Sequence, residues 1–129
     1  MSYLERRARQ YARQGKAECG FRVIDGQQDG LGPRWHHGLA TIEQDEIVFV
    51  PYLGGLRFLR RAPVQIPVTS VDQGAERQPK VTEIVGTNPK AMIVRLSTPT
   101  ATLEWAILPD QLAWATSRVA GQDDTTVHE

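Results

Sequence analysis

Apolar and polar residues alternate along most of this chain with a period of two, which is typical of β-strands that bury one face. Cys19, Phe21 and Val23, for example, alternate with Glu18 and Arg22. The segments that follow this pattern and are bounded by turn residues are predicted strands. They are residues 18–23, 34–42, 47–52, 56–61, 64–71, 92–97 and 102–107, with a weaker signal at 81–85.

Turn residues divide these segments. Residues 25–33 hold three glycines, a proline and two aspartates, which predicts a loop. The polar link at 43–46 joins two strand patterns and predicts a β-hairpin. Pro63 and Pro67 cannot donate to a strand ladder, so the segment between them is predicted to lie at a sheet edge or a bend.

Two segments have the period of a helix instead. Residues 3–14 carry a thin apolar face and end at Gly15, a residue that favours helix termination. Near the C-terminus, Asp110 is predicted to cap a helix that ends before Gly121. The apolar stripe of this second helix consists of Leu112, Ala115, Thr116 and Val119.

Short strands joined by tight turns, with no helices between them, predict a mainly β fold. We expect a small antiparallel barrel or sandwich of about seven strands, closed by one C-terminal α-helix over 110–120. A chain of 129 residues suits one domain, which we place at 16–121. Residues 1–15 form a basic, helix-patterned segment, and the acidic tail 122–129 is predicted to be disordered.

Charge is balanced overall but unevenly distributed. The formal net charge is zero, which argues against general nucleic-acid binding because that function usually leaves a basic excess. Residues 1–16, however, have a net charge of +4, because Glu5 is their only acidic residue. Their basic residues are Arg6, Arg7, Arg9, Arg13 and Lys16.

The residues that could carry chemistry do not form a recognisable site. His36 and His37 are neighbours on a strand and point to opposite faces, so they are not expected to share a metal. Cys19, the only cysteine, shares the inward face of its strand and is expected to be a buried, inert thiol. The carboxylates at 43–46 lie in a turn, where they are solvated. We therefore expect no catalytic residue, no metal and no cofactor.

Basic residues give the one candidate binding site. The arginines at 57, 60 and 61 lie near a loop and a sheet edge, and two more join them if the sheet brings them together. Such a cluster would attract an anionic surface or a phosphate group. The candidate anionic-surface patch is Arg22, Arg34, Arg57, Arg60 and Arg61.

The order of strands, ending in a tryptophan-bearing strand (103–107) and a capping helix, resembles the pleckstrin-homology-like superfold. The segment GLATIEQDEIVFVPY (38–52) is similar to the hairpin of GRAM-type and bacterial pleckstrin-homology domains, and IPVTSVD (66–72) resembles the stretch after their fourth strand. The resemblance covers residues 16–120. In phosphoinositide-binding relatives, basic residues around the first strands hold the lipid headgroup, which is what this resemblance implies for the arginine patch.

A narrower resemblance rests on four segments. They are the basic N-terminus, ECGFR (18–22), GPRWHHGLA (32–40) and EWAILPDQLAW (104–114), which together are similar to a family of small uncharacterised actinobacterial proteins. Members of that family commonly carry one N-terminal membrane helix before the domain. This sequence has no apolar run of that length, so either the helix was removed or this member is soluble. The family implies no reaction and no catalytic residues.

The sequence therefore predicts a non-enzymatic binding or scaffolding module that interacts with a protein or with an anionic membrane surface. Its expected location is the cytoplasm, at the inner face of the membrane. Two alternatives remain open at this point. One is a small-ligand-binding barrel or a divergent enzyme, which would show a deep pocket with convergent polar groups. The other is a structural subunit held through the sheet edge near Pro63 and Pro67.

Overall fold

The mainly β prediction is confirmed. The computed structural model describes residues 3–53, 56–60, 62–78 and 90–121, and among them it forms eight strands and two helices. The elements are α1 (Tyr3–Arg13), β1 (Lys16–Gly26), β2 (His36–Glu43), β3 (Glu46–Leu53), β4 (Leu56–Arg60), β5 (Val64–Pro67), β6 (Ser70–Arg77), β7 (Met92–Ser97), β8 (Ala101–Ile107) and α2 (Pro109–Val119). The predicted strand segment 81–85 and the tail 122–129 lie outside the described residues.

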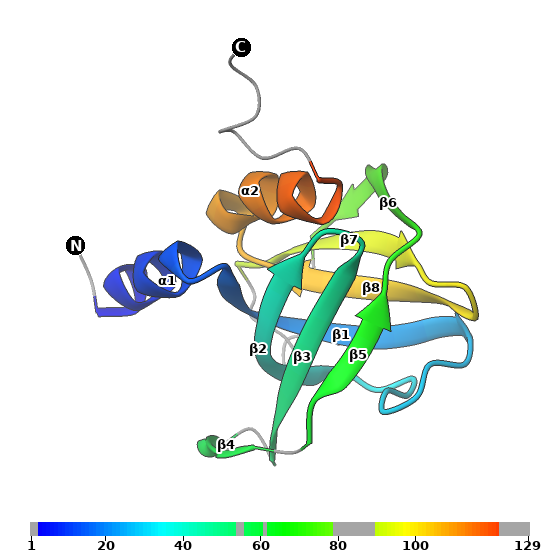
Figure 1. The fold of residues 1–129 in the computed structure, drawn as a ribbon, viewed down its shortest axis with the longest axis horizontal. Helices are drawn as coiled ribbons and strands as arrows, with labels where there is room; N and C mark the ends of the chain where they lie inside the picture. Colours follow the sequence, from blue (N-terminus) through cyan, green and yellow to red (C-terminus); the bar gives the residue numbers. More distant parts are fainter. Residues whose placement is uncertain (1–2, 54–55, 61, 79–89, 122–129) are drawn as a thin grey trace.

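The strands form one antiparallel sheet that curls into a half-barrel (Figure 1). Its order is β4-β3-β2-β1-β8-β7-β6, and β5 pairs with β3 alongside β4. Between β5 and β6 the chain crosses from one end of the sheet, where β5 pairs with β3, to the other end, where β6 pairs with β7. At this corner the N–H of Val68 donates to the carbonyl of Asp45 and the N–H of Thr69 to that of Ser97. The prediction of an edge or bend at Pro63 and Pro67 is confirmed, because β5 pairs with β3 and the chain turns directly after it.

The β2–β3 hairpin forms as predicted, with a turn shorter than the polar link. Glu43 pairs with Glu46, so only Gln44 and Asp45 form the turn. Asp45 adopts a φ of 62°, a left-handed conformation that aspartate tolerates better than most residues. The loop before β2 lies two residues later than predicted, at 27–35, because β1 continues through Gly26 after a register shift between Val23 and Asp25 and β2 begins only at His36.

The core lies on the concave side of the curled sheet. Its centre is Trp105, whose ring stacks on Phe21 at 5.8 Å between centroids and an interplanar angle of 7°. Phe49 meets the edge of Phe21 at 4.9 Å. All three side chains are fully buried. The alternation in β1 therefore marks the inward face correctly, with Cys19 and Phe21 buried in this core.

Helix α2 closes one end of the half-barrel (Figure 1). The predicted cap is wrong: the N-cap residue is Leu108, which makes no side-chain capping bond. Pro109 is the first residue of the helix, where an N–H would have no partner within the helix in any case. Asp110 therefore lies inside the first turn, where its charge complements the helix dipole. The predicted end is confirmed, since Gly121 has a φ of 76° directly after the helix.

Helix α2 is tied to the hairpin as well as packed on the core. Its predicted stripe is buried at Ala115, Thr116 and Val119. The N–H of Asp45 donates to the carbonyl of Val119 at 2.8 Å, and the Arg118 guanidinium donates to the carbonyl of Ile42. These bonds fix the C-terminal end of the helix against β2 and β3.

Candidate functional site

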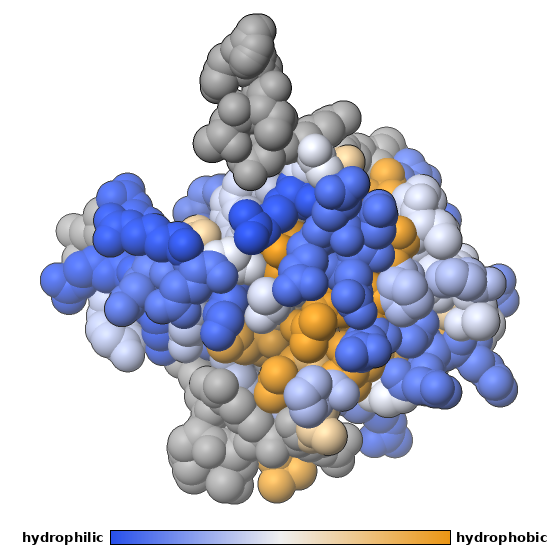
Figure 2. Space-filling view, viewed as in Figure 1, coloured by the Kyte–Doolittle hydropathy of each residue, from blue (hydrophilic) through white to orange (hydrophobic). Residues whose placement is uncertain are grey.

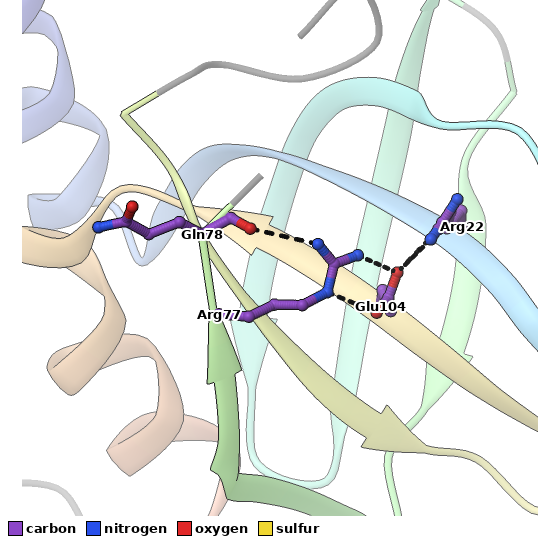
Figure 3. Close-up of polar contacts among 4 residues, drawn as sticks. All are labelled: Arg22, Arg77, Gln78 and Glu104. Atoms are coloured by element: carbon purple, nitrogen blue, oxygen red, sulfur yellow. Dashed lines mark hydrogen bonds and ion pairs between the residues drawn. The ribbon is translucent and has the colours of Figure 1, made fainter. Parts of the chain in front are cut away.

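The outer face of β1, β8 and β6 carries a carboxylate held between two guanidinium groups (Figure 3). Glu104 on β8 is only 5% exposed and lies opposite Arg22 on β1 in the strand register. Arg22 Nε donates to Glu104 Oε1 at 2.8 Å. Arg77 at the end of β6 donates through Nη2 to Oε1 at 2.9 Å and through Nε to Oε2 at 3.2 Å. Both carboxylate oxygens are therefore engaged.

This arrangement keeps Glu104 ionised. Burial alone would raise the pKa of its carboxyl group, but the hydrogen bonds and positive charges of Arg77 and Arg22 lower the pKa below its ordinary value. A general acid or base that works near neutral pH needs a pKa close to the working pH. The pKa of Glu104 is instead shifted away from neutral pH, so the role of this carboxylate is to stabilise the fold.

Aromatic and apolar side chains pack beside this ion-pair cluster. The guanidinium of Arg22 lies 5.2 Å from the ring centroid of Trp35, a cation–π contact. Trp35 in turn packs against Ala91, Ile93 and Ala106, which are buried on the same face. Arg22 is thus held on two sides by the fold.

A second carboxylate attaches α1 to the sheet. Arg7 donates through Nε and Nη2 to Glu18 Oε1 at 3.1 and 2.8 Å. The hydroxyl of Tyr52 donates to the other oxygen, Oε2, at 2.7 Å. Glu18 belongs to β1 and Tyr52 to β3, so one carboxylate joins the helix to two strands. The positive charge of Arg7 is therefore paired with the carboxylate of Glu18.

Cys19 is enclosed by the core, as the sequence predicts. Burial raises the pKa of its thiol to about 12, against a smaller opposing effect of the Trp105 indole N–H. The thiolate is therefore scarce at neutral pH, and the side chain is not a nucleophile. Within the described residues no group of three or more histidine, cysteine, aspartate or glutamate side chains gathers closely enough to hold a metal ion.

The five arginines of the candidate patch do not share one setting. Arg22 is half-buried in the ion-pair cluster, and Arg34 is exposed in the loop before β2. Arg57 and Arg60 belong to β4 at the far edge of the sheet, separated from β1 by β3 and β2. Arg61 lies outside the described residues.

The structure adds a basic surface that the patch does not include. Arg6, Arg9 and Arg13 are all exposed on α1. At about 100° per residue these positions fall within roughly 60° of one another around the helix. We call these three residues the α1 stripe. Figure 2 shows the side of the molecule formed by α1 as strongly hydrophilic. In the sequence, the spacing of three and four residues between these arginines is the pattern that indicates one shared helix face.

Searches against protein-family models, curated proteins and solved structures give no match to this chain. Neither described helix has the length and apolar character needed to cross a membrane.

Proposed function

We propose that this chain is a non-enzymatic, pleckstrin-homology-like binding module that attaches to an anionic membrane surface. The antiparallel half-barrel with a C-terminal helix is compatible with that fold. The cytoplasmic leaflet of a bacterial membrane is the anionic surface that fits this role. The narrower likeness to an actinobacterial family stays a prediction.

One observation supports the membrane proposal most directly. The chain as a whole has no net charge, yet residues 1–16 have a net charge of +4. Helix α1 presents part of this charge to solvent from a fixed position on the domain, because Arg7 binds Glu18. Each basic side chain near an anionic bilayer contributes roughly 1 kcal/mol of attraction.

Three polar or reactive side chains in the described part of the chain are engaged in the fold, which favours a binding role over catalysis. Glu104 is engaged by two arginines, Glu18 by Arg7 and Tyr52, and Cys19 is buried in the core. Each of these groups stabilises the fold. An enzyme would instead need an acid, base or nucleophile with a pKa matched to its task.

Vesicle sedimentation tests the proposal. Anionic vesicles of phosphatidylglycerol mixed with phosphatidylcholine are compared with vesicles of phosphatidylcholine alone, at low and at moderate salt. We expect binding to the anionic vesicles only, weakened by salt because the Debye length shortens to about 8 Å at physiological ionic strength. Equal binding to both vesicle types, or binding to neither, would overturn the proposal. The second outcome would leave a protein partner as the working model.

A further inference from the structure

We infer that the α1 stripe is the membrane-contacting surface, and that it responds to the density of negative charge without selecting one lipid headgroup. The inference rests on the proposed function and names the site and the ligand class. Its basis is the position of Arg6, Arg9 and Arg13 on the helix surface turned away from the sheet.

The two sides of α1 differ in what they contact. Arg7 reaches Glu18 on β1, and Ala8, Tyr11 and Ala12 are half-buried on that side. The α1 stripe is centred on roughly the opposite side of the helix, at about 100° per residue. The helix is therefore docked by one face and presents its arginines with the other.

The docking contact fixes the orientation of the stripe. Glu18 accepts two hydrogen bonds from Arg7 and one from Tyr52, so α1 is held to both β1 and β3. After the helix, the carbonyl of Gly15 accepts from the N–H of Ile42 at 2.8 Å, which holds the connection to β1 against β2. A basic stripe held in this way loses little conformational freedom when it meets a flat surface.

The shape of the stripe argues against a headgroup pocket. From Arg6 to Arg13 the helix axis advances about 10 Å, so the three guanidinium groups are spread along a convex surface. A specific phosphate site instead converges several donors on one anion. Tyr3 is 66% exposed, with its ring centroid 5.4 Å from the guanidinium of Arg7, and tyrosine is enriched in the interfacial region of membranes.

Two triple variants test the site in the vesicle assay. R6Q/R9Q/R13Q removes the charges of the α1 stripe. R34Q/R57Q/R60Q removes the same number of charges from the candidate anionic-surface patch. We expect the first to weaken partitioning onto anionic vesicles on the order of 100-fold, because each basic residue contributes roughly fivefold. The matched control should weaken it by less than about threefold. Circular dichroism and the thermal midpoint confirm that both variants fold.

The results separate the two proposals. If the wild type binds anionic vesicles and the control variant is the one that loses binding, the α1 stripe is wrong and the membrane function stands. If the wild type binds no vesicles, both fail. A third arm adds millimolar glycerol 1-phosphate or inorganic phosphate at matched ionic strength. We expect no competition, and displacement by either anion would overturn the charge-density inference in favour of a phosphate site.

Discussion

We expect Trp105→Ala to lower the free energy of unfolding by about 3–5 kcal/mol, the usual cost of removing a large buried aromatic side chain. Trp105 is fully buried and stacks on Phe21, which in turn meets Phe49. Its loss would leave a cavity at the point where the inward faces of β1, β3 and β8 meet. Urea unfolding, read from the midpoint and the slope of the transition, measures the change.

Trp105→Phe is the matched control. The indole N–H of Trp105 is buried and has no hydrogen-bond partner among the described residues, apart from its proximity to the weakly accepting thiol of Cys19. Phenylalanine keeps an aromatic ring against Phe21 and removes only some volume and a donor whose one contact is the weakly accepting Cys19 thiol. We expect a loss below about 2 kcal/mol. A loss under about 1 kcal/mol for the alanine variant would contradict a core role for Trp105.

The second large effect concerns Glu104. We expect Glu104→Gln to lower the free energy of unfolding by about 2–3 kcal/mol, because it leaves Arg22 and Arg77 without their shared anion. The cost falls below the roughly 3–5 kcal/mol of a fully buried pair, since the two arginine side chains remain 29% and 27% exposed and partly hydrated. Glu43→Gln is the control, because Glu43 is exposed in the hairpin and should change stability by less than about 0.5 kcal/mol.

The same pair of variants tests the pH dependence. The pKa of Glu104 is lower in the folded protein than in the unfolded chain. Its stabilising contribution is therefore fully present above the unfolded value of about 4.3, and it is lost as the pH falls through the lower, folded value. We expect wild-type stability to drop more steeply than that of Glu104→Gln as the pH falls below about 4.3. Parallel stability curves over that range would show that the carboxylate is not held as described.

The sequence predicts the strands well where burial is one-sided. In β3 and in the first residues of β1 the alternation assigns each side chain to a face, because a shift of one residue would expose the core; in β2, by contrast, Gly38, Leu39 and Ala40 are buried in succession. Strand boundaries are predicted less accurately, as at Asp25 and Gly26, because glycine and aspartate are also typical of loops. The cap at Asp110 was misplaced because Pro109 begins the helix one residue earlier.

The ion-pair cluster was not predicted, for a physical reason. Arg22 and Glu104 are 82 positions apart, and Arg77 reaches Glu104 only after an irregularity between Asp72 and Arg77 shifts the register of β6. Neither spacing is visible in local patterns. A glutamate between two core positions also looks like an ordinary solvated residue of an outer strand face. The charge of the N-terminal segment was visible, but which arginine docks the helix depends on Glu18, a tertiary contact.

Site-directed labelling tests most directly whether α1 meets an anionic bilayer with its arginine-bearing face. Gln10 is exposed on α1 near the stripe, and Gln65 is exposed on β5. Each is replaced by cysteine and labelled with a polarity-sensitive fluorophore, while Cys19 stays unlabelled because it is buried and its thiol pKa is about 12. With phosphatidylglycerol vesicles, we expect a blue shift and protection from an aqueous quencher for the label at Gln10, and no change at Gln65. A response at Gln65 with none at Gln10 would contradict it.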